Sequence, residues 1–448
     1  MKHYFFMALF LSLASLSMGQ KQSNPQTAVP SDSPESEKIR NFGSSLEQYA
    51  KKKEKKSPDK QPSKKVVDDD EVIRVETDLV LHDYLVTDPK GNVITGLRKG
   101  DFVVSEDGVT QNVEIFSSST NRSVPRSIVL IIDGGLNQLP YLQMSVESAK
   151  ALVDKLGPQD KLAIVTAFGK LERDFTADKA QLKATLDFVE KQGRELRVWV
   201  GRRMKSEELE KLQTLEKFKT KEDVLKAYTF GTFGSLIAVL NEMFDEPGRQ
   251  QLIVFQGDGF QVSYLKLDKE HPNPLAHSTR TYSFGGGYTD IKKLSAFGFA
   301  DVKEAIESSR TSIYSIITGV QFFGLPEKQR IERAERMVDV WTKEFNWKGS
   351  NIPARRKWFV DREEKRSTAA QSAMYRVAEL SGGNTAVMEK PEDAERIYSD
   401  ILAVINNRYV LGYYPSDSKK GEKRRNVKVE IRGHPEYVIT GRSTYILK

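Results

Sequence analysis

The sequence feature that most limits the fold is an unbroken apolar run, Ile128-Val129-Leu130-Ile131-Ile132, which ends at Asp133-Gly134-Gly135. A strand with one solvated face alternates apolar and polar residues, whereas this run is apolar at every position, so both of its faces should be buried. A helix-period stretch follows at residues 142–156, and residues 161–168 form the next predicted strand. This order of elements predicts a parallel sheet with helices on both faces.

The same alternation of strand and helix continues toward the C-terminus. It predicts strands at 251–255, 312–317 and 384–388, and helices at 236–244, 300–309, 369–380 and 391–407. We therefore expect residues 125–407 to form one α/β domain with a doubly wound, mostly parallel sheet. Three stretches interrupt the alternation and are interpreted as insertions: a charged one at 195–226, an aperiodic one at 263–299, and a basic, aromatic one at 322–366.

Short β-rich segments with Gly and Asp turns flank this domain at 71–120 and 408–448. Solitary strands would leave open edges and bury little apolar surface. The two ends of a domain often lie close together. We therefore expect the two segments to pack as one small β-sandwich into which the α/β domain is inserted. Within the second segment, residues 437–447 are predicted to form a hairpin through Gly441.

The N-terminal residues are typical of an exported protein. Residues 1–19 combine Lys2, an apolar stretch at 4–16 and small residues before Gln20, as in a cleaved signal peptide. Residues 20–70 are rich in Lys, Ser, Pro and Gln and are predicted to be a disordered, Lys-rich tether. We expect a periplasmic or secreted protein with no transmembrane segment after cleavage.

Composition excludes several classes of chemistry. The 448 residues include no cysteine, which rules out disulfides, thiol catalysis and Cys-ligated metal centres. The formal net charge of +7 is mild for this length and does not indicate a nucleic-acid binder. The sequence also has no GxSxG nucleophile elbow and no HExxH motif. Composition and motifs together favour a protein that is not an enzyme.

Oxygen-bearing residues occupy three positions at or near the ends of predicted sheet elements. Asp133 ends the first apolar strand, Thr232 precedes a helix, and Asp258 ends the strand at 251–255. Ligands of doubly wound sheets collect at the carboxyl ends of the strands. Two carboxylates and a hydroxyl at one edge would suit a hard cation such as Mg²⁺. Each aspartate also has an ordinary interpretation as a cap or turn residue.

These three positions resemble, in order, the metal-ion-dependent adhesion site of von Willebrand factor A (VWA) domains. The flanking sequence resembles a VWA-related subgroup abundant in Acidobacteria, through residues 86–97 (VTDPKGNVITGL), 101–104 (DFVV), 106–111 (EDGVTQ), 378–383 (AELSGG) and 408–415 (RYVLGYYP). The resemblance covers residues 72–448 apart from the insertions. It implies a VWA-like fold and a role in adhesion or assembly.

The chain departs from the family at the first metal motif, DxSxS, whose two serine hydroxyls coordinate the ion. Here Gly135 has no side chain, and Asn137 offers an amide oxygen in place of the second hydroxyl. The resemblance therefore implies a degenerate site made of Asp133, Asn137, Thr232 and Asp258. We expect no cofactor, with Mg²⁺ or another divalent cation as the alternative.

The leading hypothesis is a non-enzymatic binding or adhesion protein. It would contact a protein, matrix or envelope ligand through the loop face at the carboxyl ends of the sheet. An alternative is an envelope scaffold that binds anionic glycan through Lys51–Lys56 and the Trp, Phe, Lys and Arg residues of 322–366. That insertion also has a structural interpretation, as a helical hairpin with its own apolar contacts. A hydrolase hidden among the insertions is the third hypothesis.

Overall fold

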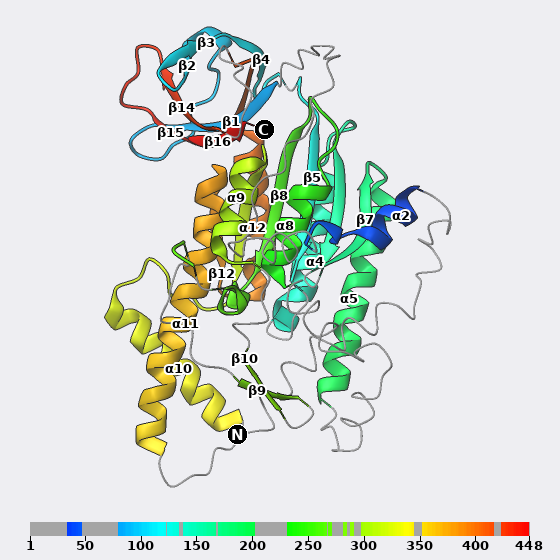
Figure 1. Cartoon of the computed structure of the whole chain (residues 1–448), viewed down its shortest axis with the longest axis vertical. Helices are drawn as coiled ribbons and strands as arrows, with labels where there is room; N and C mark the ends of the chain where they lie inside the picture. The colour runs from blue at the N-terminus through cyan, green and yellow to red at the C-terminus, as the bar shows by residue number, and fades with distance from the viewer. Residues whose placement is uncertain are drawn as a thin grey trace, which may run out of the picture.

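The chain folds into an α/β part and a β-sandwich stacked on one end of it (Figure 1). The computed structural model describes residues 34–46, 79–121, 123–133, 138–166, 169–201, 231–266, 268–270, 281–284, 287–290, 297–344, 352–415 and 423–447. The predicted signal peptide, Val72–Val75, Asn137 and most of the insertion at 195–226 lie outside the described residues. Among the described helices, none combines the length and apolarity needed to cross a bilayer.

The central sheet has six strands in the order β12-β11-β8-β5-β6-β7. Its members are β5 (Arg126–Ile132), β6 (Lys161–Thr166), β7 (Lys170–Thr176), β8 (Gln250–Gly257), β11 (Ser312–Thr318) and β12 (Thr385–Met388). Numbered along the chain within the sheet, the order is 3-2-1-4-5-6, that of a doubly wound fold. Every neighbouring pair is parallel except β6 with β7. The predicted α/β fold class is confirmed.

The antiparallel edge strand β7 was not expected. Its sequence, KLERDFT, is mostly polar, and its burial alternates over its first half. This is the pattern of an edge strand with one wet face, whereas the interior strands β5 and β11 are buried at every position. A continuous apolar run therefore identifies the centre of this sheet but not its border.

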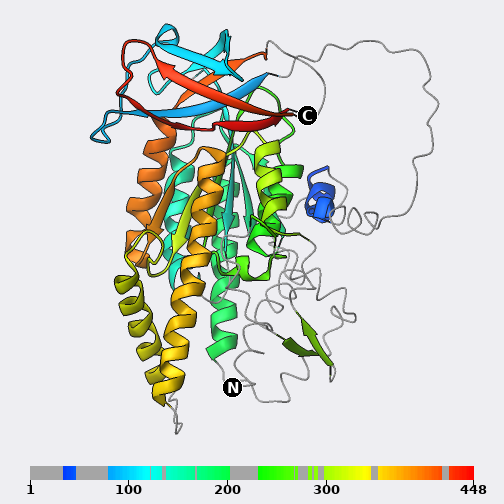
Figure 2. The same ribbon diagram turned by 60° about the vertical axis from the view of Figure 1, so that its left-hand side comes forward.

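Helices cover both faces of the sheet (Figures 1 and 2). One apolar cluster joins the sheet to α4 (Leu139–Asp154), α5 (Lys179–Gly201) and α12 (Ala394–Asn406). A second joins the opposite face to α8 (Thr232–Glu242), α9 (Phe299–Ser308) and α11 (Ile352–Ser381). Complete burial of β5 and β11 thus follows from helices packed on both sides.

The sandwich is built from both flanking segments, as the fold-class prediction requires. One sheet has the order β15-β1-β13-β4, and the other β16-β14-β2-β3. The strands are β1 (Val80–Thr87), β2 (Phe102–Glu106), β3 (Val109–Gln111), β4 (Val113–Ser117), β13 (Tyr409–Tyr413), β14 (Lys423–Ile431), β15 (Val438–Gly441) and β16 (Thr444–Leu447). Their inward side chains form a single apolar cluster.

The predicted hairpin at 437–447 is wrong. Strand β15 pairs with β1 in one sheet, whereas β16 pairs with β14 in the other. The chain therefore crosses between the sheets at Arg442, whose buried guanidinium donates to the carbonyls of Ile306 (2.9 Å) and Thr311 (2.7 Å). These contacts tie the crossing to the α/β part, which a two-strand hairpin would not do.

The insertion at 322–366 forms a helical hairpin that extends beyond the sheet (Figure 2). Helix α10 (Glu327–Glu344) packs against the first half of α11 around Phe322, Ala334, Val338 and Val360. The sequence predicts a separate helix at 369–380 after the insertion. In the structure this helix is the second half of α11, which runs without a break from 352 to 381. Trp358 stays 52% exposed, so the aromatic content of this stretch is only partly used in packing.

The described part of the insertion at 263–299 is a small hairpin and two connections. Strands β9 (Thr281–Phe284) and β10 (Gly287–Asp290) pair with each other, apart from the central sheet. A parallel bridge joins Lys266 to Gly298 and closes the excursion at its base. The insertion thus leaves and rejoins the domain at adjacent points.

The prediction of a disordered tether over 20–70 is wrong for residues 34–46. Helix α2 (Pro34–Asn41) lies against β7, where Lys38 Nζ is 3.3 Å from Asp174 Oδ2. Phe42 and Leu46 are buried in the apolar cluster of the α/β part, and Glu242 accepts the backbone N–H groups of Gly43 and Ser45. The apolar spacing of Ile39, Phe42 and Leu46 in an otherwise polar stretch explains this anchoring.

A buried ion pair joins the sandwich to the amino ends of the sheet strands. Arg408 is fully buried, and its Nε lies 3.3 Å from Oδ2 of Asp83, a contact of charge rather than a well-aligned hydrogen bond. Asp83 also accepts from Gln250 Nε2 (2.7 Å) and Ser312 Oγ (2.5 Å), at the starts of β8 and β11. The carboxyl ends of these strands therefore point away from the sandwich.

Replacing Asp83 tests how strongly this junction depends on the ion pair. Asp83→Asn leaves the Arg408 charge buried without its counter-charge, so we expect the free energy of unfolding to fall by about 3 kcal/mol or more. Urea denaturation measures the change. Asp400→Asn, which removes an exposed partner of Arg396, should cost no more than about 0.5 kcal/mol. Equal losses in the two variants would contradict the prediction.

The pH dependence of stability should report on His82, which is buried between the rings of Tyr84 and Tyr445. Burial, with Arg442 and Arg310 nearby, lowers the pKa of His82 well below 6.5. Below about pH 6.5 the unfolded chain takes up a proton that the folded chain does not. The free energy of unfolding should therefore decrease as the pH is lowered, by up to about 1.4 kcal/mol per pH unit.

His82→Phe should remove this slope in urea titrations between pH 7.5 and 5.5. The control is His434→Asn, at a half-exposed ring stacked on Tyr437. It should keep the slope. A slope that persists in His82→Phe would assign the effect to other groups.

Candidate functional site

The loop face at the carboxyl ends of the sheet is set by the pairing of β5 with β8. This pairing places Ile132 beside Gln256, and the N–H of Asp133 donates to the carbonyl of Gln256 at 3.1 Å. Asp133 therefore lies opposite Gly257, and Asp258 is the next residue of that strand end. Both aspartates lie on the same edge of the sheet.

Thr232 reaches this edge from the first turn of α8. Its Oγ1 donates to Oδ2 of Asp133 at 3.4 Å, and both residues are buried, with exposed fractions of 1% and 3%. A side chain at Gly257 would meet both, since a Cβ there would lie 3.3 Å from Asp133 Oδ2 and 3.5 Å from Thr232 Cγ2. The glycine lets the carboxylate and the hydroxyl approach the strand end closely.

Asp258 is half-buried, and its Oδ1 accepts the N–H of Phe260 at 2.9 Å. This bond forms an Asx turn at the start of the 3₁₀ segment Phe260–Tyr264. Asp258 thus has the turn role that its sequence context allows, in addition to its place at the edge. Asn137, the remaining predicted ligand, lies outside the described residues.

Two glutamines that the sequence did not single out organise the same edge. The side-chain oxygen of Gln261 accepts the backbone N–H of Thr232 and so caps the start of α8. Gln256, fully buried at the end of β8, donates to Ser145 Oγ (2.8 Å) and accepts from the hydroxyl of Tyr398 (2.6 Å). A polar residue at the end of an apolar run was the available signal for Gln256; Gln261 had none.

Helix α11 fixes the loop after β8 from outside. Gly259 has a left-handed backbone with φ +71°, and a Cβ there would overlap the carbonyl oxygen of Ala370 and lie 2.9 Å from Met374 Cγ. Arg366 lies on α11 one turn before Ala370, and its guanidinium is 4.3 Å from the ring centre of Phe260. The loop that carries Asp258 is therefore held in one position.

Two of the predicted ligand groups have hydrogen-bond partners within the chain. The hydroxyl of Thr232 already donates to Asp133, and one oxygen of Asp258 is used by the turn. Magnesium requires near-octahedral oxygen ligation and relies on well-placed carboxylates. The hydrogen bond of Thr232 to Asp133 brings two of the predicted ligands into contact.

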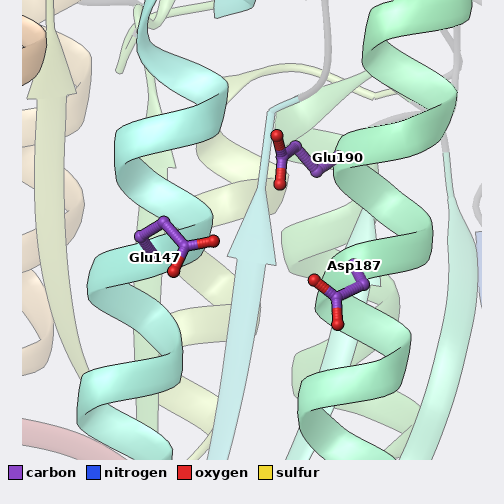
Figure 3. A group of neighbouring side chains, drawn as sticks. All are labelled: Glu147, Asp187 and Glu190. Carbon is purple, nitrogen blue, oxygen red and sulfur yellow. The ribbon is translucent and has the colours of Figure 1, made fainter.

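A cluster of three acidic side chains lies between α4 and α5, on the side of the sheet that these two helices cover. Glu147, Asp187 and Glu190 point toward one another with carboxylate oxygens within 4.8 Å (Figure 3). Lys150 Nζ lies 2.8 Å from Glu147 and 2.5 Å from Asp187. An ammonium group therefore already supplies the positive charge that two of these carboxylates need, and the cluster acts as a helix–helix ion-pair network.

Comparisons with known proteins add no functional detail. No family model and no curated relative matches the chain. Solved structures with a similar fold include an aerotolerance-related membrane protein from Bacteroides fragilis (13% identity, 63% of this chain and 98% of that one, TM-score 0.31). Another is the vWF domain of the type V pili tip protein Mfa5 from Porphyromonas gingivalis (12%, 63% and 95%, TM-score 0.30).

A third is the pilus adhesin SpaC from Lactobacillus rhamnosus GG, matched at 8% identity over 80% of this chain and 49% of that one, with a TM-score of 0.36. The chain thus spans about half of that adhesin. The α/β part of this chain has a doubly wound sheet, as its strand order 3-2-1-4-5-6 shows.

Gly259→Ala tests whether the edge loop depends on its contact with α11. The substitution forces an alanine into the left-handed region and against Ala370, so we expect a loss of at least about 2 kcal/mol in the free energy of unfolding. Gly324→Ala is the matched control. It also has a positive φ, +82°, but open space around the added Cβ, and should cost only about 1 kcal/mol. Urea denaturation of both variants isolates the contact with α11.

Proposed function

We propose that this chain is an exported, non-enzymatic binding protein that contacts a protein, matrix or envelope ligand through the loop face around Asp133, Thr232 and Asp258. The observation that carries the proposal is the buried contact of Thr232 with Asp133 at the strand edge facing away from the sandwich. In doubly wound folds this edge is where ligands bind.

The preorganisation of the edge supports recognition. The Asx turn at Asp258, the Gln261 cap on α8 and the bond from the N–H of Gly169 to Ser235 Oγ (2.9 Å) each fix a loop through a side chain. Loops that are ordered before binding lose less conformational entropy when a partner docks. Rigid loops on a rigid sheet are a suitable frame for a binding surface.

The proposed mode of binding is independent of metal. The hydroxyl of Thr232 and one oxygen of Asp258 already have protein partners, so the ligand would be recognised by shape and hydrogen bonding. Among the described residues of this edge, the polar side chains are carboxylates, amides and hydroxyls that bond to one another or to backbone. The hydroxyl of Thr232 bonds to a carboxylate and not to a histidine or lysine base, and both groups are buried, which supports binding over catalysis.

Capture from the native envelope fraction tests this proposal. The full chain should retain a partner equally well with Mg²⁺ or with EDTA, and calorimetry with Mg²⁺ should give no binding heat. Asp258→Arg adds bulk and reverses a charge at the loop face, so it should reduce capture by about tenfold or more.

The control is Asp400→Arg, the same change at an exposed site on α12. It should leave capture unchanged, with circular dichroism verifying the fold of both variants. Loss of capture in EDTA would contradict the metal-free mode. Equal effects of the two substitutions would contradict the loop face as the binding surface.

A further inference from the structure

A row of aromatic and basic side chains follows the first half of α11, in the hairpin that extends beyond the sheet (Figure 2). Trp358, Arg362 and Arg366 are spaced four residues apart, so they share one side of the helix. These three residues, the α11 stripe, cover about 12 Å along the helix axis. At its end the stripe reaches Phe260, two residues after Asp258 in the loop that follows β8. The stripe therefore adjoins the loop face.

Aromatic rings hold both guanidinium groups of the stripe in position. The guanidinium carbon of Arg362 is 4.9 Å from the ring centre of Trp358, and that of Arg366 is 4.3 Å from the ring centre of Phe260. A guanidinium that packs its flat side on a ring keeps the N–H groups at its edge available to an acceptor. Among the described residues, Nε of Arg366 is buried and has no hydrogen-bond acceptor. Stacking thus orients these cations while leaving hydrogen-bond donors unused.

The carboxylates nearest in sequence to the two arginines have other partners. Oδ1 of Asp361 lies 2.8 Å from Nζ of Lys365. Oε1 of Glu364 lies 2.5 Å from Nε of Arg330, on α10. The third carboxylate, Glu363, is buried and accepts a hydroxyl from the next turn of α11 at 3.0 Å. Two of the three negative charges are therefore already matched by cations outside the stripe.

The stripe consequently carries an excess of positive charge. Within the part of the chain that the structure describes, neither Arg362 nor Arg366 forms an ion pair. Burial and, secondly, the like charge of Arg366 lower the pKa of Arg362, and Glu363 offsets this effect only in part. Lys357, beside the stripe, adds an exposed cation. Like charges held close together without a counter-ion favour the binding of an anion.

The stripe also presents an apolar surface to solvent. Trp358 is 52% exposed, although Arg362 covers one side of its indole and the ring of Phe359 meets it edge-on at 4.8 Å. A flat apolar ring beside fixed cations suits a ligand that has an apolar face and a negative group. An acidic sugar has both, because its C–H face packs on an indole and its carboxylate pairs with a guanidinium. A helix offers no free backbone edge to which a peptide strand could add.

We propose that the α11 stripe binds an acidic polysaccharide, with a sugar ring on Trp358 and carboxylates at Arg362 and Arg366. Arginine pairs with a carboxylate through two parallel N–H···O bonds, which fix both the position and the direction of the ligand. The length of the stripe requires several linked sugars. This site needs neither Asp133 nor Thr232, so it is an additional binding surface beyond the proposed loop face.

Three polymers separate the contributions of charge and of sugar rings. Polygalacturonate has both, its fully methyl-esterified form keeps the rings without the charge, and poly-L-glutamate keeps the charge without the rings. Titration calorimetry measures the binding of each polymer to the full chain. Polygalacturonate should bind, and each of the other two should bind about tenfold more weakly or less, because one lacks the charge-assisted hydrogen bonds and the other lacks the contact with the indole.

Two variants with matched controls locate the site. Trp358→Leu and Arg362→Gln should each weaken polygalacturonate binding about tenfold, since one removes the ring platform and the other removes a charged donor. Tyr414→Leu, at a 46%-exposed ring just after β13, and Arg396→Gln, at an exposed site on α12, should leave it unchanged. Circular dichroism verifies the fold of all four variants.

Failure of the unmodified chain to bind polygalacturonate would overturn the proposal. Equal binding of poly-L-glutamate would assign the affinity to charge alone and would also contradict it. The same holds if Trp358→Leu and Arg362→Gln bind polygalacturonate like the unmodified chain. These polymers do not include the native partner of the loop face, so this experiment and the capture experiment can fail independently.

Discussion

The two-part architecture depends on the burial of opposite charges where the sandwich meets the sheet. Asp83 lies on β1, near the start of the described sandwich, and Arg408 precedes β13, where the chain returns to it. Neither charge would be stable there alone, because a buried ion without a counter-charge costs several kcal/mol. Each segment therefore needs the other. Since Asp83 also bonds to residues at the starts of β8 and β11, the same carboxylate orients the sandwich on the sheet.

Much of the fold follows from hydrophobic patterning, and the exceptions have physical reasons. Unbroken apolar runs at 128–132 and 252–255 indicate strands with two covered faces, and the helical stretches between them favour a parallel sheet between helix layers. Strand β7 and helix α2 were missed because each buries only part of a polar sequence, and their partners are distant in the chain. The crossing at Arg442 was misread as a hairpin, since local sequence does not show which sheet each strand joins.

The candidate site was predictable only where it depends on strand ends. Asp133 and Asp258 follow apolar strands, so their placement on one edge follows from the parallel pairing of β5 with β8. The Thr232–Asp133 contact needed the position of α8 as well, for which the family resemblance was the guide. The cap from Gln261 and the fit of Gly259 against Ala370 join residues 29 and more than 100 positions apart. No local pattern encodes such contacts.

Helix α11 has a mechanical consequence beyond its packing. Its first half belongs to the outlying hairpin with α10, its middle supports the loop after β8, and its last residue, Ser381, accepts the N–H of Ile313 in the sheet. The carbonyl of the next residue, Gly382, accepts a hydrogen bond from the guanidinium of Arg408 at the base of the sandwich. One stiff rod thus spans the molecule from end to end. Because the same helix contacts all three regions, a movement of α11 would also move its contacts with Gly259 and with Ile313.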